Sequence, residues 1–178
     1  GLAVVYQHPA IADDITVLEN MLLAMPAGRR PRFRAAERWA REQLDAVGAR
    51  IDPLRRASDL SAAEHQLVEI AKALALEPRV LILDEPTTGL DWREQLAILE
   101  LLHELNRARV TIVVISHSPW LVAEHAQRVV LMARGRVLFD GPVHELLRAE
   151  EALRAGSFVL PDASLLGLRF GVAARSVD

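Results

Sequence analysis

The chain has 178 residues, of which 51% are apolar and 25% charged, a composition that excludes a disordered or a fibrous protein. Its 21 basic and 24 acidic residues give a net charge of −3, which argues against a protein that coats nucleic acid. Cysteine is absent, which excludes disulfides and thiolate metal sites, and no apolar run is as long as a membrane-spanning helix.

Three elements are predicted in the first third of the chain. The apolar run Leu2–Tyr6 predicts a strand, and the pair His8-Pro9 interrupts it. A helix is expected to start at Thr16, because Glu19 follows at the spacing of a capping box. A second helix is predicted at about Ala35–Val47 and is ended by a glycine.

The middle of the chain alternates helices with short apolar strands. A capping-box pattern begins a helix at about Ser61–Leu76, and a longer helix is predicted at Arg93–Arg107. The apolar runs Val80–Leu83 and Thr111–Ile115 predict strands buried on both faces, as in parallel sheets. This order predicts right-handed α/β crossovers.

The last third predicts a short helix, a hairpin and a final helix. The first helix is expected at Trp120–His125. The turn signal Arg134-Gly135 between Val129–Met132 and Arg136–Phe139 indicates a β-hairpin. A final helix is predicted from Val143 to about Leu153, and the remaining residues follow a less regular pattern.

Two adjacent carboxylates, Asp84 and Glu85, follow the predicted strand Val80–Leu83. Open α/β sheets bind their ligands at the carboxyl ends of strands, and adjacent extended residues point in different directions. Asp84 can therefore reach Mg²⁺ through water, while Glu85 is free to orient or deprotonate an attacking water. The alternative interpretation is a solvated turn with two acidic residues.

His117 strengthens the interpretation of the acidic pair. It follows the next predicted strand, Thr111–Ile115, and could there hydrogen-bond a γ-phosphate or the attacking water. A single histidine is more often structural or merely exposed, and the chain has six. Its position at a strand end makes His117 a stronger candidate for a functional residue than the other histidines.

The segment Leu60–Glu64 begins the predicted helix and forms a candidate anion site. A helix N-terminus attracts phosphate through free N–H groups and its dipole. Ser61 adds a hydroxyl, and the small side chains of Ala62 and Ala63 allow close approach. The alternative is that Ser61 only caps the helix and Glu64 only closes the box.

The single lysine excludes one phosphate-binding motif. Of the 21 basic residues, 20 are arginine and one, Lys72, is lysine. A P-loop requires Gly-x-x-x-x-Gly-Lys-Ser/Thr, whereas Lys72 lies in a helical segment without a nearby glycine. The 178 residues therefore contain no P-loop.

Together these segments resemble the nucleotide-binding subunits of ABC transporters, from about Val4 to Leu147. The order of these segments along the chain and the spacing between them agree with the family pattern throughout. The matches, in chain order, are Gln7 with the Q-loop glutamine, Leu60–Glu64 with the signature Leu-Ser-Gly-Gly-Gln, Val80–Glu85 with Walker B and the catalytic glutamate, Gly89–Asp91 with the D-loop, and His117 with the switch histidine.

The resemblance implies a P-loop NTPase-type α/β fold, a three-layer sandwich with a mostly parallel sheet and a helical subdomain, here without the N-terminal β region and Walker A. It divides the chain into the end of the N-terminal core (1–7), the helical subdomain (8–76), the ATPase core (77–141) and a C-terminal helix and tail (142–178). Because the family places its P-loop before the Q-loop, we expect an N-terminally truncated ATPase with no turnover of its own.

The resemblance also implies roles and partners. Two ATP-binding subunits, identical or different, are expected to enclose two ATP molecules with Mg²⁺. They are expected to lie on the cytoplasmic face of a membrane and to contact integral membrane permease subunits. No nucleic-acid partner is expected. The implied catalytic residues are Glu85 and His117, the implied Mg²⁺ ligands are Asp84 and Gln7, and the implied nucleotide-binding residues are Gln7, Ser61, Ala62, Ala63, Asp84 and Asp91.

The signature segment departs from the family pattern at three positions. Ala62 and Ala63 replace both glycines, and Glu64 replaces glutamine. A carboxylate beside a γ-phosphate is repulsive unless it points back into its capping box. The two alanines are what a non-catalytic subunit that donates only its signature face would show, and this is one alternative. A non-transport ABC ATPase is a second alternative.

The solute class stays open between two kinds of importer. The segments Ala49–Pro53 and Leu67–Leu74 resemble monosaccharide-importer ATPases. The segments Glu145–Leu147, Leu160-Pro161 and Leu165–Leu168 instead resemble the energy-coupling-factor ATPases that import vitamins and transition metals.

Overall fold

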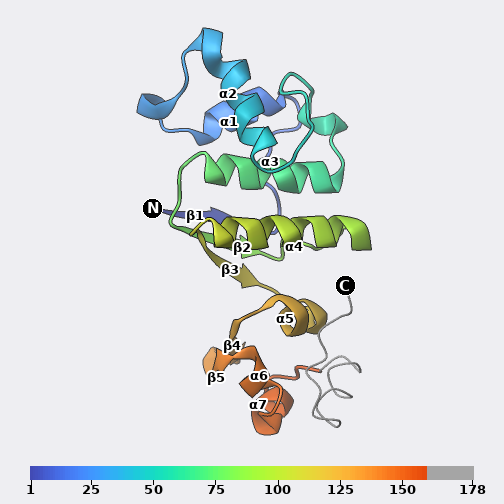
Figure 1. Cartoon of the computed structure of the whole chain (residues 1–178). Helices are drawn as coiled ribbons and strands as arrows, with labels where there is room; N and C mark the ends of the chain where they lie inside the picture. Colours follow the sequence, from blue (N-terminus) through green and yellow to red (C-terminus); the bar gives the residue numbers. More distant parts are fainter. Residues whose placement is uncertain (160–178) are drawn as a thin grey trace. The chain divides into compact units, whose positions relative to one another are not determined.

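The computed structural model describes residues 1–159 (Figure 1). The chain divides into two compact units, Gly1–Ile115 and Ser116–Asp178, and each has its own hydrophobic core. The tail segments Leu160-Pro161 and Leu165–Leu168 lie outside the described residues. Within those residues, no helix is both long and apolar enough to cross a membrane.

The first unit contains a three-stranded parallel sheet. Its strands, in spatial order, are β1 (Leu2–Val5), β2 (Val80–Asp84) and β3 (Thr111–Ile115). In the register of the sheet, Val5 of β1 lies opposite Leu83, and Asp84 lies opposite Ile115. Because the strands are parallel, all three carboxyl ends lie at one edge of the sheet.

Four α-helices belong to the first unit: α1 (Val17–Ala24), α2 (Phe33–Asp45), α3 (Ala62–Leu74) and α4 (Trp92–Arg107), with short 3₁₀ turns at Ala27–Arg29 and Ala57–Asp59. Capping boxes begin α1 and α3, as their sequences predict, and a third begins α4. Each box satisfies backbone N–H groups that a helix N-terminus otherwise leaves unpaired.

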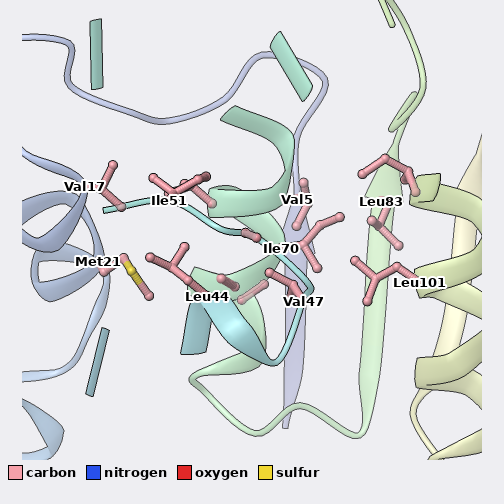
Figure 2. Packing of buried hydrophobic residues seen from close by; sticks show 14 of the residues in the cluster. Val5, Val17, Met21, Leu44, Val47, Ile51, Ile70, Leu83 and Leu101 are labelled. Atoms are coloured by element: carbon pink, nitrogen blue, oxygen red, sulfur yellow. The ribbon is translucent and has the colours of Figure 1, made fainter. Parts of the chain in front are cut away.

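One core runs through the first unit, and α3 is at its centre. Figure 1 shows α3 between the sheet and the helices α1 and α2, all of which it contacts. Figure 2 shows Ile70 of α3 among side chains from both sides, including Val5 of β1 and Leu44 of α2. Helix α3 is therefore buried on most of its surface, and it links the sheet to the helical segment.

Up to residue 159, the second unit contains a hairpin and three short helices: α5 (Pro119–His125), β4 (Arg128–Ala133), β5 (Arg136–Pro142), α6 (Val143–Leu146) and α7 (Glu150–Ala155). Arg134 and Gly135 both have positive φ, at 51° and 71°. Such angles are typical of the two-residue turn that the sequence predicts here. The small core contains Leu131, Leu146 and Leu153.

Two expectations about the elements are wrong. The predicted final helix is interrupted, because hydrogen bonds tighten to the i−3 carbonyl at Arg148 and Ala149, separating α6 from α7.

The strands are not buried on both faces. Leu81 and Leu83 of β2 are buried, but the intervening residues are only half-buried, and β3 alternates between exposed and half-buried residues. β3 is an edge strand, which explains its greater exposure.

Candidate nucleotide site

Two neighbouring parallel strands place three candidate residues at one edge of the sheet. β2 ends at Asp84, which is half-buried, and Glu85 follows it directly. Val5, at the end of β1, pairs with Leu83, and the exposed Gln7 follows two residues later. The structure therefore brings Gln7, Asp84 and Glu85 to adjacent strand ends, where α/β sheets bind ligands.

Glu85 lies in a sharp turn with a left-handed backbone, at φ 47°. Its N–H donates to the Ile115 carbonyl at 2.9 Å, and its own carbonyl accepts from Thr88 N–H at 3.2 Å. The Thr88 hydroxyl donates to Glu85 Oε2 at 3.3 Å. A left-handed conformation is costly for a residue with a side chain, so these bonds hold Glu85 in a conformation that it would not adopt alone.

Thr88 was not among the residues expected at the site. The only sequence signal for its contact is the spacing of three residues after Glu85, which turns commonly use. The contact orients one carboxylate oxygen of Glu85 toward the turn. It thereby restricts the side chain for which the sequence predicts a role at the attacking water.

Asp91 caps helix α4. Its Oδ1 accepts from Glu94 N–H at 2.9 Å, and Glu94 Oε2 accepts from Asp91 N–H at 3.0 Å. Gly89, with φ 79°, provides the turn that precedes this cap. Asp91 is exposed and uses one carboxylate oxygen for the cap, so the other oxygen remains available for a further contact.

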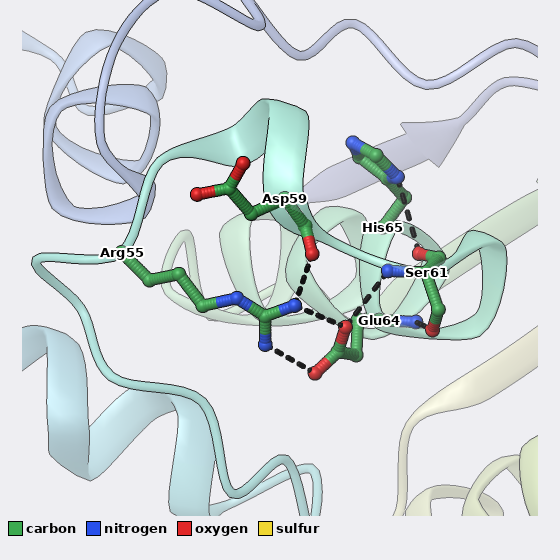
Figure 3. Close-up of polar contacts among 5 residues, drawn as sticks. All are labelled: Arg55, Asp59, Ser61, Glu64 and His65. Carbon is green, nitrogen blue, oxygen red and sulfur yellow. Dashed lines mark hydrogen bonds and ion pairs between the residues drawn. The ribbon is translucent and has the colours of Figure 1, made fainter.

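Ser61 caps helix α3 in the same way. Its Oγ accepts from Glu64 N–H at 3.2 Å, and Glu64 Oε2 accepts from Ser61 N–H at 2.8 Å (Figure 3). Ala62 is exposed and Ala63 half-buried, so no bulky side chain covers the start of the helix at these positions. An anion could approach here, and the Ser61 hydroxyl still has its own proton to donate.

Arg55 neutralises the carboxylate that replaces the signature glutamine. Its two terminal nitrogens lie 2.7 and 3.0 Å from the two Glu64 oxygens, and one of them also donates to the Asp59 carbonyl (Figure 3). The hydrogen bond from Arg55 is the main reason why the pKa of Glu64 lies below its ordinary value. The same bond raises the pKa of Arg55.

Sequence patterns do not reveal the Arg55–Glu64 pair. The two residues are nine positions apart, and the turn Ala57–Asp59 separates Arg55 from α3. No helical or strand periodicity brings such positions together. The structure shows that Glu64 points back into its capping box and toward Arg55, which is the condition under which its charge is least repulsive to an anion.

His117 lies in the second unit, whereas Gln7, Asp84 and Glu85 lie in the first. It is exposed and stands just before α5, which Ser118 caps by accepting from Leu121 N–H at 3.5 Å. Its role at a phosphate therefore stays a prediction from its place in the sequence.

The donor set at the sheet edge fits Mg²⁺. Gln7 and Asp84 offer an amide oxygen and a carboxylate, which are hard donors. Within residues 1–159, no group of three or more His, Cys, Asp and Glu side chains could hold a metal ion. One or two protein ligands are enough for Mg²⁺, because this ion usually keeps several waters and also binds the phosphates of the substrate.

Comparisons with known proteins show which family this chain is similar to. The family model described as "ABC transporter" matches residues 1–88. The ribose import ATP-binding protein RbsA 1 of Rubrobacter xylanophilus is 42% identical over 144 residues, which cover 78% of this chain and 28% of that protein. The arabinose import ATP-binding protein AraG of Paraburkholderia xenovorans is 35% identical over 151 residues, 82% of this chain and 28% of that protein.

A further relative, RbsA 2 of Agrobacterium fabrum, is 38% identical over 138 residues, 76% of this chain and 27% of that protein. The chain thus spans little more than a quarter of the length of these relatives. The family match also agrees with the P-loop NTPase-type α/β fold and its parallel sheet. The chain belongs to the ABC transporter family of ATP-binding proteins.

Proposed function

We propose that this chain forms part of an ATP-binding subunit that couples ATP hydrolysis to the import of a monosaccharide. The supporting observation is the sheet edge, where Gln7 follows β1 and the pair Asp84 and Glu85 follows the adjacent β2. The names of the ribose and arabinose import relatives support the solute class. The subunit would lie on the cytoplasmic face of a membrane, against integral permease subunits.

Glu85 is assigned to the attacking water. Its carboxylate accepts a proton from the water or orients it toward the γ-phosphate, and Thr88 limits the directions in which it can point. Asp84 and Gln7 hold Mg²⁺, which neutralises phosphate charge when bound. His117 hydrogen-bonds the transferred phosphate. Because the 178 residues contain no P-loop, tight ATP binding needs that element from outside them.

The start of α3 is assigned to an ATP molecule held mainly by a second ATP-binding subunit. Ser61 and the backbone at Ala62 and Ala63 contact its γ-phosphate, and Asp91 contacts the second subunit. The ion pair with Arg55 supports this role, because it removes the isolated negative charge that Glu64 would otherwise present. In this proposal the helical subdomain is 8–76 and the ATPase core 77–141.

The proposed function is tested by Glu85→Gln in the complete subunit, assembled with its permease in lipid vesicles. Loss of the base should reduce ATP hydrolysis at least about 100-fold while ATP binding persists. Glu100→Gln, which changes an exposed carboxylate on α4, is the matched control and should hydrolyse ATP normally. Unchanged turnover in Glu85→Gln would refute the catalytic assignment and favour a subunit that donates only its signature face.

The solute class is tested by the same vesicles. Ribose or arabinose, presented with the transporter's own solute receptor, should stimulate ATP hydrolysis and accumulate inside the vesicles. Stimulation by a vitamin or by a transition-metal ion, with none by either sugar, would contradict the monosaccharide assignment while leaving the ATPase assignment intact.

A further inference from the structure

The only lysine of the chain is buried on α3. Lys72 is 9% exposed, and its Nζ pairs with Glu69 Oε1 at 2.5 Å on the same helix. The same Nζ donates to the Ala10 carbonyl at 2.9 Å. Ala10 precedes Lys72 by 62 residues and lies in the segment that connects β1 to α1.

This connecting segment, residues 6–16, is held at a second point. The side chain of Asn20, on α1, is 3% exposed. Its Nδ2 donates to the Ala12 carbonyl at 3.0 Å, and its Oδ1 accepts from Ala12 N–H at 2.8 Å. Two buried polar side chains, Lys72 and Asn20, therefore fix adjacent parts of a segment that contains no helix or long strand.

An ion pair between Glu69 and Lys72 does not by itself explain why a lysine is buried here. A buried pair often stabilises a protein no better than apolar residues of the same size. An ammonium group has three donor hydrogens, so it can serve a carboxylate and a carbonyl at the same time. All 20 other basic residues are arginine, whereas this confined position holds the compact ammonium.

We propose that Lys72 is a positioning residue that ties the segment after Gln7 to the signature helix α3. Gln7 lies three residues before Ala10, and Ser61 begins the helix that holds Lys72. The proposal rests on the proposed function, in which Gln7 serves one ATP site and Ser61 serves an ATP held by the second subunit. A displacement of α3 at the ATP of the second subunit then moves the segment after Gln7 at the other ATP site. A displacement of that segment likewise moves α3.

The tether is tested first in the 178-residue chain by amide hydrogen exchange at Ala12, whose N–H is protected by Asn20. Lys72→Met removes the bond to Ala10 and should accelerate exchange at Ala12 about tenfold. Glu69→Gln is the matched control, because it removes the ion pair but leaves the ammonium able to bond the Ala10 carbonyl. It should change the exchange rate less than about twofold, and Lys72→Arg should restore part of the protection. Equal exchange at Ala12 in Lys72→Met and the wild type would overturn the tether.

The functional consequence is tested in the complete subunit with its permease. Lys72→Met should keep its basal ATP hydrolysis within about twofold and lose most of the stimulation by solute, whereas Glu69→Gln should keep both. The coupling role would be overturned if Lys72→Met accelerates hydrogen exchange at Ala12 and solute nevertheless stimulates its ATP hydrolysis as strongly as in the wild type. If the wild type hydrolyses no ATP, the proposed function fails, and the exchange experiment still decides whether Lys72 ties the segment to α3.

Discussion

Arg55 and Glu64 set the charge beside the first turn of α3. Glu64 bonds to Arg55 through both carboxylate oxygens and accepts the Ser61 N–H as well. The side chains of Arg55 and Glu64 are 34% and 28% exposed, so water screens the pair only in part. Glu64, which replaces the signature glutamine, is therefore part of an ion pair and does not present an isolated negative charge.

A double substitution tests this pairing at residue scale. Arg55→Ala should reduce ATP hydrolysis by the complete subunit about fivefold, because it leaves the Glu64 charge uncompensated near the phosphate. Adding Glu64→Gln should restore activity, since glutamine keeps the capping box without the charge. Arg38→Ala, which breaks an exposed pair on α2, is the control. If the double variant is as impaired as Arg55→Ala, repulsion is not the cause.

The same pair predicts a pH dependence of stability. Because the folded-state pKa of Glu64 lies below its ordinary value of 4.5, its stabilising contribution is complete above that pH. It is lost as the pH falls through the folded-state pKa. Thermal unfolding between about pH 6 and about pH 3 should therefore show a smaller loss of Tm in Glu64→Gln than in the wild type. Parallel curves for the two proteins would contradict this.

At the scale of elements, the N-terminus of α4 combines a structural cap with a proposed contact to the second subunit. Asp91→Ala should reduce the free energy of unfolding by about 1 kcal/mol, because it removes the cap. Asp91→Asn keeps an oxygen acceptor and should cost far less. In the complete subunit, Asp91→Asn should nevertheless lower ATP hydrolysis, since it lacks the charge. Normal hydrolysis in Asp91→Asn would mean that Asp91 only caps the helix.

Local patterns predicted most of the elements, because capping boxes and turn residues act over a few positions. The capped starts at Thr16 and Ser61 and the hairpin turn at Arg134 are examples. Burial was predicted less well, because it depends on which elements cover a strand and not on its own apolar run. The contacts of Arg55 and Lys72 join residues that only the folded chain brings together, so no periodicity indicates them.

At the scale of the whole molecule, each of the two units has a separate core. The core of the second unit is small, and within the described residues it centres on Leu131, Leu146 and Leu153. A small core leaves little stability in reserve, so the second unit should be the first to open.

Leu146→Ala tests the independence of the units. Leu146 is fully buried, and its truncation should cost about 2–5 kcal/mol, enough to open the second unit. Hydrogen exchange should then accelerate across β4 and β5 while α3 keeps its protection. Val137→Ala, at a position that is 57% exposed, is the control and should change neither unit. Equal loss of protection in α3 would show that the units unfold together.

The left-handed backbone of Glu85 has a consequence for protein engineering. Glycine and asparagine adopt a φ of 47° more readily than glutamate does, so they are the residues that selection for heat resistance alone would favour at this position. Such a stabilised variant would have lost the carboxylate assigned to the attacking water. Thermostability screens on this protein should therefore hold position 85 constant, or they will enrich for well-folded, inactive molecules.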